Sequence, residues 1–120
     1  TYMSENISNS KLANSTYENA KNIVRSAFGT ENPAYAILEV EQAKLQIEIQ
    51  NFEEAAQNLF KAEKFWTTKL GEENIYTAEI YLVQGLMNYK KKNYANAEKL
   101  YKKSAQQYSS IFNSSYIHYL

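Results

Sequence analysis

Histidine, cysteine and aspartate, which often supply metal ligands and catalytic dyads, are almost absent from this chain. Histidine occurs once, at His118, and aspartate and cysteine are absent. No histidine-based dyad and no cluster of histidine and cysteine ligands can therefore form within the chain. The neighbouring pairs Glu53-Glu54 and Glu72-Glu73 point in diverging directions, and such charges favour the start of a helix. The sequence predicts no catalytic site, no metal site and no cofactor, so we expect a protein that is not an enzyme.

Binding to phosphate, nucleic acid or membrane is equally poorly supported. The three glycines are isolated, which excludes a glycine-rich phosphate loop. Lys90-Lys91-Lys92 lies between Tyr89 and Tyr94, a combination found where single-stranded nucleic acid binds. A lysine run at a helix end more often offsets the helix dipole, so we expect no nucleic-acid partner. No apolar run reaches the roughly 18 residues of a membrane span, so we expect no membrane contact. The absence of cysteine is compatible with a cytoplasmic location, which we expect.

Charge is balanced overall but unevenly distributed. The formal net charge is zero. Residues 31–84 hold ten glutamates and four lysines (−6), whereas residues 85–120 hold six lysines and one glutamate (+5). Such a gradient can steer a charged partner, although it is also typical of solvated helix faces.

One segment recurs along the chain. Residues 51–62 read NFEEAAQNLFKA, and residues 93–104, forty-two positions later, read NYANAEKLYKKS. Small and large residues fall at the same places in both copies, which is typical of a stacked helical repeat. The stripe Ala55, Leu59, Ala62 and Trp66 has the spacing of one helical face. The corresponding stripe of the second copy is Ala97, Tyr101, Ser104 and Tyr108. The fold class predicted is all-α.

The corners between helices recur as well. Gly29 and Gly71 are suited to end a helix, and Asn32 and Asn74 to cap the next one. We therefore expect an incomplete first repeat over residues 1–28 and full repeats over residues 32–70 and 74–112. The expected helices run from Pro33 to about Ile49, Phe52 to Leu70, Ile75 to about Lys91, and Tyr94 to Phe112.

The two ends are harder to interpret. Within the first repeat a turn is expected at residues 8–10 or, in an alternative phase, at residues 14–16. Residues 113–116 fall where a third corner is due, so residues 116–120 are expected to begin a truncated repeat. A stack cut there exposes an uncovered end. We therefore expect a piece of a longer protein, or an end that another chain covers.

With these segments in place, the chain resembles tetratricopeptide repeat proteins of the 42-residue type found in kinesin light chain. The resemblance rests on residues 32–36, 43–45, 51–55 and 70–74, and on residues 85–87, 93–97 and 98–101 of the second copy. It implies an α-solenoid of stacked antiparallel helix pairs, a single domain over residues 1–120. Ala43/Gly85 and Ala55/Ala97 are then sites of close helix approach, with Phe52/Tyr94 and Leu59/Tyr101 filling the gap.

A polar line departs from the family pattern. Gln42, Gln46, Gln84 and Asn88 stand where large apolar residues or tyrosine are usual. Buried unpaired amides cost roughly 1–3 kcal/mol each. These residues are therefore expected either to form a hydrogen-bonded ladder in the core or to face the groove of a rotated helix.

The resemblance also implies where a partner binds, namely along the concave wall built from the first helix of each repeat. The wall positions are Ile37, Val40, Glu41, Lys44, Ile47, Glu48, Glu79, Leu82, Val83, Leu86, Tyr89 and Lys90. Their mostly apolar character suits an amphipathic helix or hydrophobic strip of a protein or peptide partner. We therefore expect a non-catalytic interaction module. The alternatives are a regulatory domain of a larger caspase-like protease or histidine kinase, and a scaffold that self-associates through exposed solenoid ends.

Overall fold

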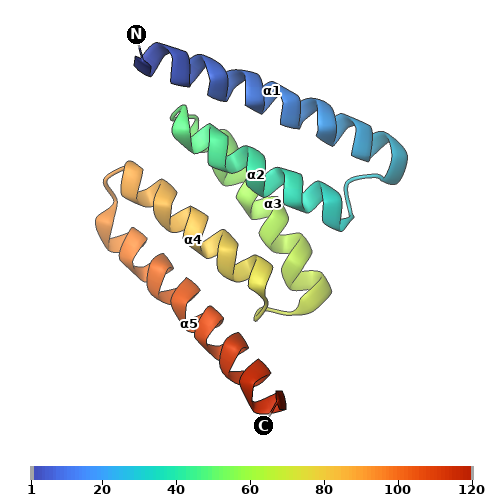
Figure 1. Cartoon of the computed structure of the whole chain (residues 1–120), viewed down its shortest axis with the longest axis vertical. Helices are drawn as coiled ribbons and strands as arrows, with labels where there is room; N and C mark the ends of the chain where they lie inside the picture. Colours follow the sequence, from blue (N-terminus) through green and yellow to red (C-terminus); the bar gives the residue numbers. More distant parts are fainter. Residues whose placement is uncertain (1, 120) are drawn as a thin grey trace. The chain divides into compact units, whose positions relative to one another are not determined.

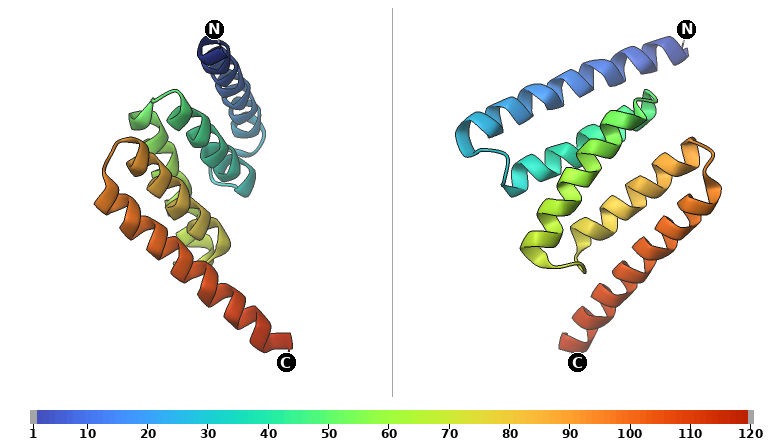
Figure 2. Two further views of the ribbon diagram at one scale, coloured as in Figure 1. Left: turned by 60° about the vertical axis from the view of Figure 1, so that its left-hand side comes forward. Right: turned by 180° about the vertical axis from the view of Figure 1, so that it is seen from behind.

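The computed structural model describes the backbone of residues 2–119 and the side chains of residues 8–113. Over that range the chain is helical and contains no strand (Figure 1). The helices are α1 (Tyr2–Phe28), α2 (Pro33–Glu48), α3 (Phe52–Leu70), α4 (Ile75–Lys90) and α5 (Tyr94–Tyr119). They form two compact units, an N-terminal unit Thr1–Phe65 and a C-terminal unit Trp66–Leu120. In the first unit α1 packs against α2, and in the second α4 packs against α5, each pair antiparallel (Figure 2).

The corners that begin α2 and α4 confirm the expected caps. Asn32 and Asn74 each accept a hydrogen bond from the backbone N–H three residues further on, at 3.0 and 2.8 Å. Each amide also donates to the carbonyl oxygen of the glycine three residues before it, at 2.7 and 2.8 Å. Those glycines, Gly29 and Gly71, have φ angles of 80° and 82°, a backbone region that residues with a Cβ atom rarely adopt. In each copy, a glycine thus ends one helix and an asparagine three residues later caps the next.

The turns inside the two repeats also match. Gln50 and Lys92, forty-two residues apart, are non-glycine residues with φ angles of 62° and 67°. The residue after each donates its backbone N–H to a carbonyl five residues back, at 2.7 Å for Asn51 and 2.8 Å for Asn93. This is the left-handed C-terminal cap of a helix, which satisfies carbonyls that the helix itself leaves free.

The buried stripe of α3 is where the sequence places it. Ala55, Leu59 and Ala62 are 0% exposed and Trp66 is 5% exposed. On α5, Ala97 and Ser104 are buried while Tyr101 and Tyr108 are half-buried. Ser104 replaces an alanine of the first copy, and its hydroxyl donates to the Ala78 carbonyl at 2.7 Å, so the added polar atom is satisfied.

Close helix approach in the C-terminal unit depends on Gly85. A Cβ atom at this position would lie 2.7 Å from two ring atoms of Tyr101. Tyr101 therefore fills the space that the missing side chain leaves, as expected.

The predicted equivalence of Phe52 and Tyr94 is wrong, because Phe52 is half-buried whereas Tyr94 is 57% exposed. Tyr94 is the first residue of α5, and its ring has an edge-on contact with Tyr89 at 5.4 Å.

Three predicted turns are absent from the described backbone. α1 is continuous through residues 8–10 and 14–16, and α5 is continuous through residues 113–116, so no corner separates residues 116–120 from the helix before them. These segments contain serine, threonine and asparagine but no glycine. Such side chains can bond the preceding helical turn instead of breaking it, as Thr16 does when it donates to the Leu12 carbonyl at 3.0 Å. The side chain of His118 lies outside the described residues.

Candidate functional site

The six wall positions on α2 divide into core and surface. Val40 and Ile47 are 6% and 1% exposed, so they are core residues and do not line an exposed wall. The physical reason is that both side chains are apolar and lie on a covered side of α2, together with Ala36 and Ala43. The positions that reach solvent fully or in part are Ile37, Glu41, Lys44 and Glu48. Among these, Lys44 pairs with Glu41 at 3.0 Å.

The six wall positions on α4 are more accessible. Val83 is buried at 5% exposure and is a core residue. Glu79 is half-buried and Lys90 is exposed. Leu82, Leu86 and Tyr89 are large apolar residues that remain 45%, 38% and 55% exposed. The C-terminal unit therefore presents more of the predicted wall to solvent than the N-terminal unit does.

Together with Ile75, which is 48% exposed, these three residues form a line that we call the α4 seam: Ile75, Leu82, Leu86 and Tyr89. Their intervals of seven, four and three residues are those of a heptad repeat, and Glu79 occupies the position between the first two. A straight line of half-exposed apolar side chains with this spacing is typical of a surface that receives another helix.

In the N-terminal unit the polar line is buried and hydrogen-bonded. Gln42 and Gln46 are each 2% exposed. The Lys21 ammonium, on α1, donates to Gln42 Oε1 at 2.9 Å and to Asn58 Oδ1 at 3.2 Å. Asn58 Nδ2 donates to Gln46 Oε1 at 2.9 Å, and Gln42 Nε2 donates to Glu18 Oε2 at 2.7 Å. We call these five residues the polar cluster. The ladder interpretation is therefore correct for this unit.

Two ionisable groups, one in the polar cluster and one beside it, have pKa values shifted from their ordinary range. Burial lowers the pKa of the Lys21 ammonium, and attraction by Glu18 and Glu39 opposes that effect. Glu39 is 4% exposed, and burial raises the pKa of its carboxyl to about 7. Attraction by Lys21 and Lys61 lowers this pKa but does not cancel the effect of burial. The N-terminal unit therefore holds a carboxyl group that titrates near neutral pH.

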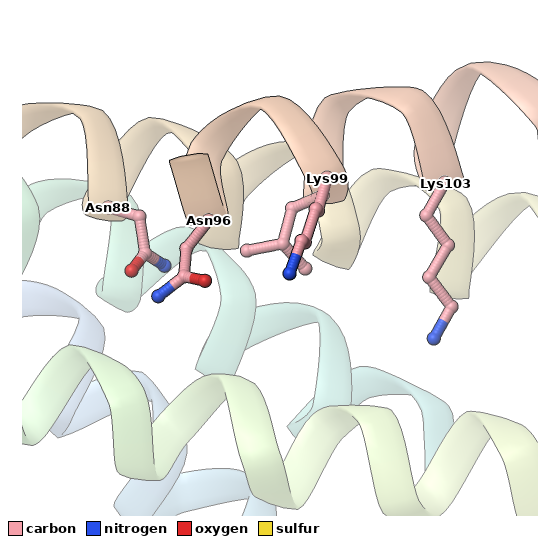
Figure 3. A pocket seen from close by; sticks show the side chains of 5 residues that line it. Asn88, Asn96, Lys99 and Lys103 are labelled. Atoms are coloured by element: carbon pink, nitrogen blue, oxygen red, sulfur yellow. The ribbon is translucent and has the colours of Figure 1, made fainter. Parts of the chain in front are cut away.

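The equivalent amides of the C-terminal unit are in a different environment. Gln84 and Asn88 are half-buried, and Asn88 Nδ2 donates to the Gln84 carbonyl within α4 at 2.8 Å. Asn88 lines an open hollow of about 380 Å³ together with side chains of α5 (Figure 3). In the N-terminal unit, Gln46 lines a smaller hollow of about 210 Å³. The amides of the polar line are thus buried and bonded to other side chains in the N-terminal unit, whereas those of the C-terminal unit are partly exposed.

The amides of the polar line are evident in the sequence, but their partners are not. Lys21 and Asn58 were not recognised as part of the polar line, nor were Asn96, Lys99 and Lys103 as lining a hollow. The available signal was Asn58, which is polar where the second copy has Leu100.

Other classes of site are not visible in the described part of the chain. Among the described side chains there is no group of three or more His, Cys, Asp or Glu residues placed to hold a metal ion. Within residues 2–119, none of the helices combines the length and apolar character of a membrane span. No family model, no curated protein and no solved structure matches this chain.

Proposed function

We propose that this chain is a non-catalytic protein-binding module whose α4 seam receives an amphipathic helix of a partner protein. The observation that carries the proposal is the exposure of Leu82, Leu86 and Tyr89 at heptad spacing on one side of α4. A helix with apolar residues at the same intervals can lay them along this line, which removes apolar surface of both helices from water.

The chemistry of the seam favours a helix over an extended peptide. An extended strand is held through backbone hydrogen bonds to a sheet edge, and the described residues contain no strand. Groove asparagines that hold an extended chain are also missing from the seam, which consists of Ile75, Leu82, Leu86 and Tyr89 around Glu79. Apolar contact at intervals of three and four residues is therefore the recognition mode that the surface offers.

The proposal includes the repeat architecture that the resemblance to tetratricopeptide proteins implies. It is supported by features that recur at an offset of forty-two residues. These are the Gly29/Gly71 and Asn32/Asn74 corners and the positive φ angles of Gln50 and Lys92. The unit that recurs is one antiparallel helix pair, which cannot by itself cover both of its apolar sides. An exposed seam on α4 is consistent with such a stack.

The test uses a displayed library of amphipathic helical peptides selected against the 120-residue chain. The selected peptide is titrated with the wild-type protein and with Leu82→Ser/Leu86→Ser. Each leucine is already partly buried, so its remaining burial contributes about 1 kcal/mol. We expect roughly thirtyfold weaker binding by the double variant and an increase in peptide helicity on binding.

The matched control is Leu12→Ser/Phe60→Ser, which removes two exposed apolar side chains outside the seam. This control is expected to keep the wild-type affinity. Binding that survives the seam variant, or that is lost equally in the control, contradicts the proposal. Sedimentation of the free protein gives a further check. A dimer that disappears in Leu82→Ser/Leu86→Ser would assign the seam to a second copy of the chain and overturn the partner-helix assignment.

A further inference from the structure

We propose that the C-terminal unit carries a second site, which binds the carboxylate groups of an acidic peptide segment. The site is the hollow of about 380 Å³ lined by Asn88, Asn96, Lys99, Leu100 and Lys103, which we call the lysine hollow. It goes beyond the proposed function, because the α4 seam is apolar and shares none of these residues.

The lysine hollow is built by two helices. Asn88 lies near the end of α4, and the other lining residues lie in the first three turns of α5. Figure 3 shows the side chains of Asn88, Asn96, Lys99 and Lys103 extending to the same side of these helices. Lys99 and Lys103 are four residues apart, so they are neighbours on one face of α5. Two ammonium groups and two amides thus surround a space large enough for a side-chain carboxylate.

The charge in the hollow is not neutralised by its own lining. The lining contains two lysines and no carboxylate, which gives +2. The glutamate of α5 closest in sequence, Glu98, pairs with Lys102 at 3.0 Å. Lys103 lies 4.3 Å from the ring centroid of Tyr81, a cation–π contact that holds the side chain in place and leaves its charge intact. The lysine hollow is therefore a cationic site with one of its charges positioned.

The N-terminal unit has a hollow at the equivalent position, and the charges of its lining residues are balanced. Its lining residues Gln46, Glu54, Gln57, Asn58 and Lys61 each lie forty-two positions before one of the five residues of the lysine hollow. Glu18, Lys21 and Gln42 complete it, so two glutamates balance two lysines. Gln46 Nε2 donates to Glu54 Oε2 at 3.4 Å.

From the first copy to the second, two exchanges change the charge. Glu54 corresponds to Asn96, and Gln57 corresponds to Lys99. One exchange removes a negative charge and the other adds a positive one. The lining of the first copy therefore balances its charges, whereas the lining of the second holds two ammonium groups and no carboxylate, which favours a negatively charged ligand.

The donors favour carboxylates of a peptide over a nucleic acid. Single-stranded nucleic acid is held by aromatic side chains on which bases stack, and the lining of the lysine hollow contains none. The amides of Asn88 and Asn96 can donate to a carboxylate beside the ammonium groups. Leu100 offers an apolar surface for the methylene groups of a glutamate side chain. The +5 charge of residues 85–120 adds long-range attraction for an acidic segment.

The experiment measures fluorescence anisotropy of fluorescein-labelled octaglutamate titrated with the wild-type chain at low ionic strength. The test variant is Lys99→Gln/Lys103→Gln, and the matched control is Lys11→Gln/Lys69→Gln, which removes the same charge from exposed positions on α1 and α3. Loss of two charge-assisted contacts is expected to weaken binding about tenfold in the test variant, equivalent to about 1.4 kcal/mol. The control is expected to change affinity less than about twofold, since Lys11 and Lys69 do not line the hollow and exposed charges outside it are screened.

Several outcomes overturn the proposal. Absence of saturable octaglutamate binding would show that the chain has no such site. Equal weakening in both double variants would show that binding depends on net charge and not on the lysine hollow. A single-stranded oligonucleotide of equal charge that binds at least as tightly, through the same two lysines, assigns the site to phosphate and refutes the peptide assignment. Asn96→Ala keeps the charge and is expected to weaken octaglutamate binding about threefold. Circular dichroism of every variant shows whether the fold is kept. Failure of the helix-library experiment leaves each of these results unaffected.

Discussion

Replacement of Glu39 by glutamine should remove the pH dependence that this buried carboxyl gives to folding. Glu39 is 4% exposed, and burial raises the pKa of its carboxyl from 4.5 to about 7. Attraction by Lys21 and Lys61 acts in the opposite direction but is the smaller effect. The folded protein therefore binds the proton more tightly than the unfolded chain does. Glu39→Gln keeps the shape and removes the ionisation.

The sign follows from proton linkage. Between pH 4.5 and about pH 7 the unfolded chain has lost the Glu39 proton while the folded protein retains it. The contribution of this group to the free energy of unfolding is therefore fully present below pH 4.5 and is lost as the pH rises to about 7. Each pH unit corresponds to about 1.4 kcal/mol, so the whole interval corresponds to roughly 3 kcal/mol. At pH 8, Glu39→Gln should be more stable than wild type by about this amount, and the difference should vanish towards pH 4.

The assay is urea unfolding followed by circular dichroism across this pH range for wild type and Glu39→Gln. The control is Glu48→Gln, which removes an exposed carboxylate from the same helix and should follow wild type. The difference between wild type and each variant isolates one group from all other titrations. A wild-type protein that gains stability from Glu39 as the pH rises would show that attraction by Lys21 outweighs burial. That result would refute the reasoning.

Two further predictions concern helix packing and the polar cluster. Gly85→Ala gains about 1 kcal/mol of helix propensity but overpacks against Tyr101 at a cost of about 1–3 kcal/mol. Urea unfolding should show a net loss of stability that becomes a gain in the Tyr101→Ala background, and a gain with Tyr101 present would contradict the 2.7 Å approach. Asn58→Leu removes one of two acceptors from the Lys21 ammonium and should destabilise by about 2–3 kcal/mol. Lys21→Met/Asn58→Leu should recover most of that loss, and no recovery would mean that the hydrogen bonds of Lys21 are not the cause.

Helix ends were predictable from the sequence wherever one residue type has a strong local preference. Gly29 and Gly71 are glycines at positive φ, and Asn32 and Asn74 accept the hydrogen bonds expected of caps. Helix α3 has the predicted bounds, Phe52–Leu70. The turns predicted within α1 and α5 rested on the repeat offset and on serine, threonine and asparagine, whose preference is weak enough for a helix to continue through them. Local chemistry thus predicts the helix ends at Gly29 and Gly71, whereas the ends before Gln50 and Lys92 followed from the repeat.

The site was predictable in part. The repeat pattern indicates which residues share a face of a helix, but it does not indicate how deeply that face is buried. Val40, Ile47 and Val83 were expected on the wall and are buried, whereas Leu82, Leu86 and Tyr89 are exposed. One residue of rotation, about 100° on an α-helix, separates Leu82 from Val83. Which of the two faces solvent depends on the neighbouring helix, and the sequence of α4 alone carries no information about that neighbour.

The two copies of the polar line show how a repeat can keep one backbone and change its chemistry. The polar cluster depends on Lys21, which α1 supplies, and on Asn58, which α3 supplies. Position 58 corresponds to Leu100 in the second copy, and Gln57 to Lys99. A leucine cannot accept a hydrogen bond, and a second lysine cannot balance the first. The equivalent positions of the C-terminal unit therefore carry unbalanced positive charge, although α4 has the bounds of α2 at an offset of forty-two residues and begins with the same asparagine cap.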